Sequence, residues 1–237
     1  MLILQSAFRS VLNEGLKLQR VAQIMKPGTD TRAFYGRGLR VCMLVRNDVA
    51  NDPRVTRHAE TLGAHGFRVT VACTASPRTL AKEKRANYEI VRVGEHLGLA
   101  LESVAVRTGP RSVLRILVRM AQIITVHFAL FRAARKTGAH VYCANDLDTL
   151  LIGVLAAGSD GYLAYDSHEL WADMLIGVPE FVKRTLRVYE RLLIKRANAV
   201  MTVNELIGQV LASRYSVRSP IEIIYNCPSQ GRRQVSK

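Results

Sequence analysis

The segment from residue 39 to residue 74, LRVCMLVRNDVANDPRVTRHAETLGAHGFRVTVACT, contains the pattern that decides the fold. It begins with a continuous apolar run, residues 39–45, and ends with a second one, residues 67–74. Between them, residues 53–65 place apolar side chains at helical spacing behind a proline. Strands that are apolar on both faces are typical of parallel sheets covered by helices, so the segment predicts one strand–helix–strand unit of such a sheet.

The same alternation continues toward the C-terminus. Further strands are predicted at residues 88–93, 139–144, 162–166, 199–203 and 221–225, and further helices at residues 111–136, 147–157, 180–196 and 205–215. Alternating strands and helices with right-handed crossovers form a doubly wound, mostly parallel α/β domain, which we place at residues 39–228. Ligands of such domains bind beyond the carboxyl ends of the strands, so the residues after each strand are the candidates for function.

The segments that flank this domain are basic. Residues 1–26 have the periodicity of an amphipathic helix, whose polar face carries Arg9, Lys17, Arg20 and Lys26. Such a helix either lies on an anionic membrane or packs against its own domain. A Pro-Gly pair ends it, a linker extends to residue 38, and residues 229–237 form a basic tail.

The composition is that of a globular protein with a strong positive charge. Of the 237 residues, 49% are hydrophobic and 22% are charged, which excludes a disordered chain, a collagen and a disulfide scaffold. The net charge of +15 favours phosphates, nucleic acid or an anionic membrane surface, or it reflects a solvated basic surface. Because aromatic stacking platforms and nucleic-acid motifs are lacking, we expect no nucleic-acid partner.

Cysteine usage and hydropathy indicate the cytoplasm. Cys42, Cys73, Cys143 and Cys227 include no CxxC pair, so buried free thiols in a reducing compartment are expected rather than a zinc site. No signal peptide is recognised, and the longest apolar run, residues 120–131, is shorter than the roughly 18 residues of a membrane span. A buried helix explains that run. We therefore expect a cytoplasmic protein whose basic N-terminal helix allows a peripheral position on the inner face of the membrane.

The segment after the first strand offers the first candidate site residues. Either Asn51 or Asp52 is expected to cap the helix that begins at Pro53. Asn47 and Asn51 are candidates for substrate binding. Arg54 faces the crevice in the first helical turn, where it suits a phosphate or a sugar hydroxyl.

Two clusters at neighbouring strand ends extend this candidate site. Asn145 and Asp146 follow one strand, and Asp166, His168 and Glu169 follow the next. Carboxylates and amides suit the hydroxyls of a sugar, so the two clusters predict a polyhydroxylated ligand. His168 is the candidate catalytic residue, as an acid/base or orienting group, or else it is a capping or core histidine, and Asp166 is otherwise a strand-end cap. No metal is expected, because adjacent residues point in different directions.

The motifs after these strands resemble those of glycosyltransferase family 4. Asp52-Pro53-Arg54-Val55 is similar to the opening motif of that family. The segments YCANDLDTL (142–150) and YDSHEL (165–170) resemble its acceptor-side loops, and residues 190–204 resemble its next block. IYNCP (224–228) is similar to the point where the chain leaves the first domain. The resemblance covers about residues 39–228, in order and at plausible spacing.

The resemblance implies a GT-B fold, in which two Rossmann-like domains face each other across a cleft. In this family the first domain binds the acceptor, and the second binds a nucleotide-sugar, mostly through a Glu-x7-Glu motif. The nucleotide-sugar is a co-substrate, and neither a cofactor nor a metal is expected. The implied reaction is sugar transfer to a glycan or lipid-linked acceptor in the synthesis of a cell-surface polysaccharide or glycolipid.

The chain departs from the family pattern in two places. No two glutamates stand eight positions apart, so we expect the donor half to be absent and these 237 residues to hold an acceptor without transferring a sugar alone. Many relatives carry histidines in the loop at residues 143–146, where this chain has Cys143 and Asn145. That difference weakens the case for an acid/base role at this loop and leaves Asn145 able to bind a hydroxyl.

A second hypothesis is a non-catalytic glycan-binding or partner module, completed by a donor domain in a separate chain.

Two rows of cations fit the leading hypothesis of an enzyme at a membrane surface, or else they are solvated helix faces. The rows are Arg107, Arg111, Arg115 and Arg119, and Lys183, Arg184, Arg187, Arg191 and Lys195.

Overall fold

The computed structural model describes residues 38–94, 113–217, 219 and 221–226. The helix and linker predicted over residues 1–37 and the tail at residues 229–237 lie outside the described residues. The same holds for Arg107, Arg111, Cys227 and the side chain of Arg115.

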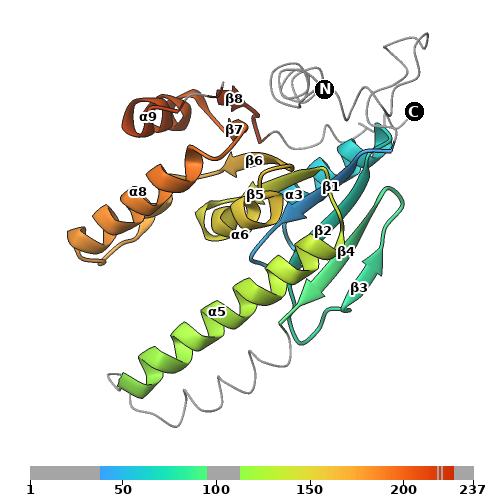
Figure 1. Ribbon diagram of the computed structural model, residues 1–237, viewed down its shortest axis with the longest axis horizontal. Coiled ribbons are helices and arrows are strands. Elements are labelled where there is room, and N and C mark those ends of the chain that lie inside the picture. The colour runs from blue at the N-terminus through green and yellow to red at the C-terminus, as the bar shows by residue number, and fades with distance from the viewer. Residues whose placement is uncertain (1–37, 95–112, 218, 220, 227–237) are drawn as a thin grey trace, which may run out of the picture.

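The described residues form an eight-stranded sheet in the order β3-β4-β2-β1-β5-β6-β7-β8 (Figure 1). Every neighbouring pair is parallel except β3 with β4. The strands are β1 (Arg40–Leu44), β2 (Arg68–Thr74), β3 (Lys82–Lys84), β4 (Tyr88–Val93), β5 (Val141–Asn145), β6 (Tyr162–Ser167), β7 (Ala199–Thr202) and β8 (Ile221–Ile223). This sheet confirms the predicted mostly parallel α/β fold.

Helices cover both faces of the sheet (Figure 1). The described helices are α3 (Pro53–Ala64), α5 (Val113–Lys136), α6 (Leu147–Ala157), α7 (Trp171–Met174), α8 (Glu180–Ile194) and α9 (Glu205–Tyr215). From β1 the chain first moves outward to β2 and later crosses back to β5 on the other side of β1. Because parallel crossovers are right-handed, this reversal places α3 on one face and α5, α6, α8 and α9 on the other.

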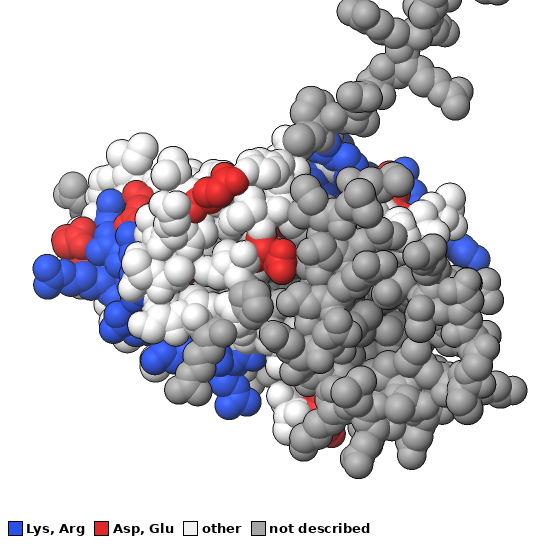
Figure 2. Space-filling view, turned by 90° about the horizontal axis from the view of Figure 1, so that it is seen from above, with Lys and Arg blue, Asp and Glu red and all other residues white. Residues whose placement is uncertain are grey.

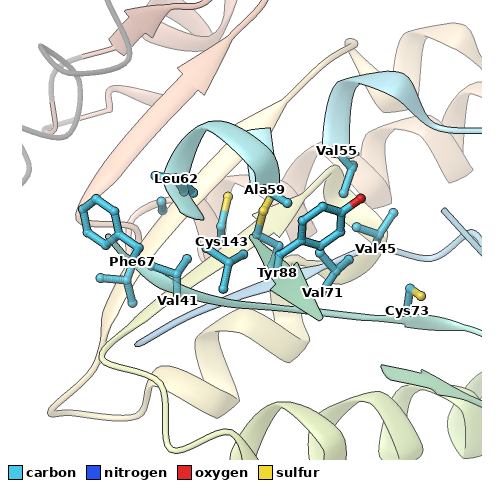
Figure 3. Packing of buried hydrophobic residues seen from close by; sticks show 14 of the residues in the cluster. Val41, Val45, Val55, Ala59, Leu62, Phe67, Val71, Cys73, Tyr88 and Cys143 are labelled. Atoms are coloured by element: carbon cyan, nitrogen blue, oxygen red, sulfur yellow. The ribbon is translucent and has the colours of Figure 1, made fainter. Parts of the chain in front are cut away.

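The two faces hold separate parts of the hydrophobic core. Figure 3 shows Val55, Ala59 and Leu62 of α3 above the strand residues Val41 and Val71. On the opposite face, each long helix contributes at least one fully buried side chain, and these include Leu130, Ala134, Leu150, Ile194 and Leu211. Complete burial of one such large apolar side chain contributes roughly 1.5–3 kcal/mol, so the helices hold the sheet from both sides.

Two short elements were not predicted from the sequence, β3 and α7. The β3 strand reads Lys-Glu-Lys and pairs antiparallel with β4 at the edge of the sheet. Its place is fixed by Glu83, which lies 2.9 Å from the buried guanidinium of Arg92 in β4. A charged edge strand has no apolar periodicity for a sequence pattern to detect, and its charges discourage pairing with another chain.

The prediction that residues 120–131 form a buried helix is wrong for most of that run. The run belongs to α5, and only 11% of its most apolar 18-residue window is buried. By length and composition alone, residues Ile116–Lys136 are the one described helix able to cross a membrane. However, Leu130 and Ala134 in its second half are fully buried against the sheet, so this part of α5 belongs to the domain core.

Candidate functional site

A small cleft opens at the carboxyl ends of β1 and β5, where the strand order reverses. Its volume is about 130 Å³. The lining residues are Val45, Arg46, Asn47, Asp52, Val55, Asn145, Asp146, Asp148 and His168. The point of reversal is where doubly wound sheets bind their ligands, because the loops on either side of it diverge and leave a crevice.

The backbone is strained on both sides of this cleft. Val49, in the loop after β1, has a φ of 62°, and Asp146, directly after β5, has a φ of 65°. Such values are disfavoured for residues with a side chain, most of all for a β-branched one. The strain at Asp146 turns the chain sharply, so that its carboxylate points toward β6 while its backbone N–H donates to the carbonyl oxygen of Asp166.

His168 lies between two carboxylates at the floor of the cleft. Its Nε2 is 3.1 Å from Oδ2 of Asp166, and its Nδ1 is 3.4 Å from Oδ2 of Asp146. Its backbone N–H donates to Oδ1 of Asp146 over 3.1 Å. These distances show that the three residues lie together and join the ends of β5 and β6 into one unit, while their convergence on one polyhydroxylated ligand stays a prediction.

This arrangement makes His168 a cation. Burial alone lowers the pKa of its imidazole, but the adjacent Asp146 and Asp166 carboxylates more than compensate and raise the pKa to about 10. Burial raises the pKa of Asp166, yet His168 and His58 hold it below its usual value, so Asp166 is an anion. An imidazolium has no lone pair with which to accept a proton, so at neutral pH the geometry favours the orienting function of His168 over that of a general base.

His58, on α3, belongs to the same network and was missed from the sequence. Its Nδ1 lies 3.6 Å from Oδ2 of Asp166, and its side chain is largely buried. Burial lowers the pKa of His58, and neighbouring Asp166 offsets this only in part. Its position one helical turn after Arg54 was the available signal, since residues four apart share a helix face.

The residues after β1 mostly build the wall of the cleft. Asp52 caps α3, accepting from the backbone N–H groups of Arg54 and Val55, so the alternative that Asn51 is the cap is wrong. Asn47 donates to Asp52 over 2.8 Å and accepts from the backbone N–H of Val49, which uses both ends of its amide. Arg54 lies beside Asp52, with 3.6 Å between Nε and Oδ1.

Asn51 and Glu169 lie away from the cleft. Both side chains are exposed, and neither is among the lining residues. The hydroxyl of Ser167 donates to the backbone carbonyl of Glu169. The backbone at Glu169 is therefore held in place, while the Glu169 carboxylate faces solvent. The structure therefore brings six of the eight sequence candidates to the cleft or its wall and leaves these two outside.

Unmet hydrogen-bonding capacity remains at the cleft floor. In the described part of the chain, four buried side-chain atoms form no hydrogen bond of good geometry, and three of them are Asn145 Oδ1, Asp166 Oδ2 and His168 Nδ1. Asp166 Oδ2 and His168 Nδ1 face the charged partners given above, so Asn145 Oδ1 is the one of the three left unpaired. Asn145 is held in place by its amide nitrogen, which donates to the carbonyl of Leu44 over 3.0 Å. Buried polar groups are nearly always paired, so the unpaired Asn145 Oδ1 marks a place suited to a ligand hydroxyl or water.

Arg46 and Asp148 also line the cleft, and neither was chosen as a candidate site residue from the sequence. Asp148 Oδ2 lies 3.5 Å from Nε of Arg46. Burial raises the pKa of Asp148 to about 6, even though Arg46 lowers it. The Nε2 of His127, in α5, lies 3.1 Å from the backbone carbonyl of Asp148, and this contact connects α5 to the cleft.

The described residues form a Rossmann-like α/β domain with its cleft at the strand reversal. The sequence model of glycosyltransferase family 4 matches residues 54–227. The chain belongs to that family, which confirms the resemblance seen in its motifs.

Solved structures agree with this fold. Sucrose-phosphate synthase from Thermosynechococcus elongatus superposes with a TM-score of 0.58 at 14% identity, over 79% of this chain and 48% of that one. A second structure of the same synthase gives a TM-score of 0.52 at 13% identity, over 80% of this chain and 90% of that one. This chain thus spans about half the length of the first synthase structure. No curated protein sequence matches it significantly.

Proposed function

We propose that this chain is the acceptor-binding part of a glycosyltransferase that moves a sugar from a nucleotide-sugar to a hydroxyl of a glycan or lipid-linked acceptor. The observation that carries the proposal is the cleft floor, where the unpaired Oδ1 of Asn145 and the partly exposed carboxylate of Asp146 line the same cleft. Membership of glycosyltransferase family 4 supplies the reaction class. The acceptor class follows from the polar lining, because carboxylates and amides recognise hydroxyls in fixed directions.

Each group at the cleft has a distinct task in this proposal. Asp146, whose side chain is partly open to solvent, accepts a hydrogen bond from an acceptor hydroxyl. His168 remains a cation that fixes the Asp146 and Asp166 carboxylates. Asp148 changes protonation near pH 6, so acceptor binding should vary as the pH falls through that value.

We also propose the co-substrate, cellular location and pathway that the sequence led us to expect. The nucleotide-sugar acts as a co-substrate without a metal, and the protein acts in the cytoplasm, at the inner face of the membrane, in the synthesis of a cell-surface polysaccharide or glycolipid. Support for this setting comes from the net charge of +15, which favours anionic surfaces, and from three buried free thiols among the described residues.

Saturation-transfer NMR tests acceptor binding directly. The probes are methyl glycosides of common hexoses and their octyl counterparts below the micelle concentration. We expect saturation of ring protons, and Asp146→Asn should weaken binding about tenfold or more, because hydrogen bonds to charged groups contribute roughly 1.5–3 kcal/mol. Asp160→Asn, an exposed aspartate in the turn before β6, is the matched control and should bind as the wild type does. No saturation with any glycoside, or equal binding by Asp146→Asn, would contradict the proposal.

A second candidate is a non-catalytic glycan-binding or partner module completed by a separate donor-domain chain. It rests on the same cleft and family membership as the first candidate, and it differs in taking its donor domain from another chain. Mass-resolved transfer assays with a nucleotide-sugar and a glycoside that binds distinguish the two. Binding without transfer, together with transfer when a donor-domain chain is added, would establish the second candidate.

A further inference from the structure

The N-terminal part of α5 from residue 116 to residue 128 carries an apolar face that is open to solvent. Six large hydrophobic side chains on this part are each between 47% and 63% exposed. They are Ile116, Leu117, Met120, Ile123, Ile124 and Phe128. Val118, on the opposite side of the helix, is buried. An exposed apolar patch of this kind marks an interaction site.

The open face continues a stripe that packs on the sheet farther along the same helix. Ile116, Met120 and Ile123 are followed by His127, Leu130 and Ala134 at alternating spacings of four and three. Residues at these spacings share one side of a helix. Leu130 and Ala134 are fully buried, whereas the exposed side chains from Ile116 to Phe128 extend for about 18 Å at 1.5 Å per residue. Figure 1 shows this N-terminal part of α5 pointing away from the sheet.

Cations border this face on both sides. At 3.6 residues per turn, Arg119 and Arg132 fall on opposite edges of it, and both are exposed. The guanidinium of Arg132 lies 5.8 Å from the ring centre of Phe128. Helix α5 contains no Asp or Glu, so nothing on the helix itself neutralises these charges. A broad apolar face between arginines fits an anionic lipid surface, which takes up both kinds of group.

The same helix is joined to the acceptor cleft. His127, next to Phe128, reaches the backbone carbonyl of Asp148, and Asp148 lines the cleft. A surface that covers the open face of α5 therefore comes close to the cleft rim. A second copy of this chain is the competing occupant, but it would bring Arg119 and Arg132 of two strongly basic molecules together.

We propose that the open face of α5 docks on an anionic lipid surface and so holds the acceptor cleft at the headgroup layer. Ile116, Ile123, Ile124 and Phe128 enter the acyl boundary, and the two arginines bind lipid phosphates. The consequence for the substrate, an acceptor carried on a lipid, rests on the proposed function; the docking itself does not. Leu130 and Ala134 keep the C-terminal end of α5 on the sheet, so the helix lies in the interface without crossing it.

Vesicle flotation of the full chain tests the docking. Vesicles of phosphatidylcholine mixed with phosphatidylglycerol should bind the protein, and vesicles of phosphatidylcholine alone should bind it far less. Ile124→Glu should weaken partitioning to the anionic vesicles about tenfold or more, because an exposed apolar anchor becomes a carboxylate. Leu206→Glu is the matched control, since it places the same charge at a 74% exposed leucine of α9.

Three results would overturn the docking proposal. They are equal binding to both kinds of vesicle, equal loss in Ile124→Glu and Leu206→Glu, and a dimer in sedimentation analysis that Ile124→Glu dissociates. Because docking does not need the cleft, Asp146→Asn should float with the vesicles as the wild type does. Failure of flotation with intact glycoside binding removes the docking alone, and the reverse pattern removes the proposed function alone.

Discussion

At the scale of single residues, His168 shows how neighbours decide what a side chain can do. The sequence places it among carboxylates, which is compatible with an acid/base or an orienting function. The distances of 3.1 Å to Asp166 and 3.4 Å to Asp146 make it a buried cation between two anions. A buried charge of this kind is stable only while it remains paired, so the three residues act as one unit.

The stability of the protein should therefore depend on pH through His168. Its pKa of about 10 in the folded state lies above the value of 6.5 for a free imidazole. Below pH 6.5 the stabilisation is fully present, and it is lost as the pH rises toward 10, because only the folded state keeps the proton in that window. We expect the free energy of unfolding, measured with urea, to fall by at most about 1.4 kcal/mol per pH unit there.

His168→Gln provides the comparison for this pH dependence. Glutamine keeps hydrogen-bonding capacity but has no proton to lose, so the slope above neutral pH should flatten. NMR of the ring protons gives a second readout, in which the His168 signals of the wild type should not move near pH 6.5. A ring that titrates there, or equal slopes in both proteins, would show that the carboxylates do not hold the proton.

The residues that sequence reasoning missed or misplaced have a common cause. His58 reaches Asp166 from α3, an element more than a hundred positions earlier in the chain. Asn51 and Glu169 stand beside true cleft residues in the sequence but point to solvent. Adjacency along the chain sets where a backbone lies, whereas the direction of each side chain depends on turns such as the strained one at Asp146.

At the scale of elements, close contact between α6 and the sheet explains a glycine in mid-helix. A Cβ on Gly153 would lie 2.8 Å from Cδ1 of Leu163 and 3.1 Å from Cβ of Ala144. Glycine costs roughly 1 kcal/mol of helix propensity relative to alanine, so its presence needs such a reason. Because Gly153 has no side chain, α6 packs close to β5 and β6. This short distance positions the N-terminus of α6, where Asp146 enters the cleft.

Gly153→Ala should therefore destabilise the protein even though alanine is the better helix former. We expect a net loss of about 1–3 kcal/mol in the free energy of unfolding, because the new methyl group overpacks a filled interface. Urea denaturation followed by far-UV circular dichroism measures it. Adding Leu163→Val removes the methyl group that clashes and should restore part of the loss, whereas additive effects of the two changes would refute this contact as the cause.

Elements also show where periodicity succeeds and where it fails. The buried strands and α3 follow the predicted pattern closely, because their apolar side chains face the core. Helix α8 follows it less well, since it buries Ile194 but exposes Phe181 and Leu192. Helix α5 follows the pattern too, yet half of its apolar face is exposed. Periodicity predicts that a face is apolar, but what covers it depends on where the helix ends relative to the sheet.

At the scale of the whole molecule, basic and apolar surfaces are distributed unevenly. Figure 2, a view from above, shows Lys and Arg side chains gathered along the left edge, on the side where α8 and α9 lie in Figure 1. Part of the predicted row on α8 is engaged in structure, since Arg187 pairs with Asp173 and Glu180, and Arg191 donates to the carbonyl of Arg214. Arg184 and Lys195 stay exposed and add to the positive field.

The hydrophobic clusters on the two faces of the sheet should unfold together in a single transition. Cys42 belongs to the core under α5 and α6, and Cys73 and Cys143 belong to the core under α3. All three are buried, and burial raises the pKa of Cys42 and of Cys73 to about 12, so none should react with a thiol reagent in the folded state. In a Cys227→Ser protein, reactivity should follow the same urea curve as the fluorescence of Trp171. A thiol that reacts at lower urea than the fluorescence change would show that one face opens by itself.

The sequence by itself determined the α/β alternation, the parallel sheet and the edge of that sheet at which the cleft opens. It did so because burial on both faces of a strand and on one face of a helix leaves a local, periodic signature. It also determined the family, through motifs at the strand ends that the matching family now confirms.

Only the tertiary structure decided which side chains meet, what charge they carry and which faces remain open. The link between His58 and Asp166, the cationic state of His168 and the exposed face of α5 all depend on contacts between distant segments. Electrostatic coupling and solvent exposure vary with distances in space, which the order of residues does not encode directly.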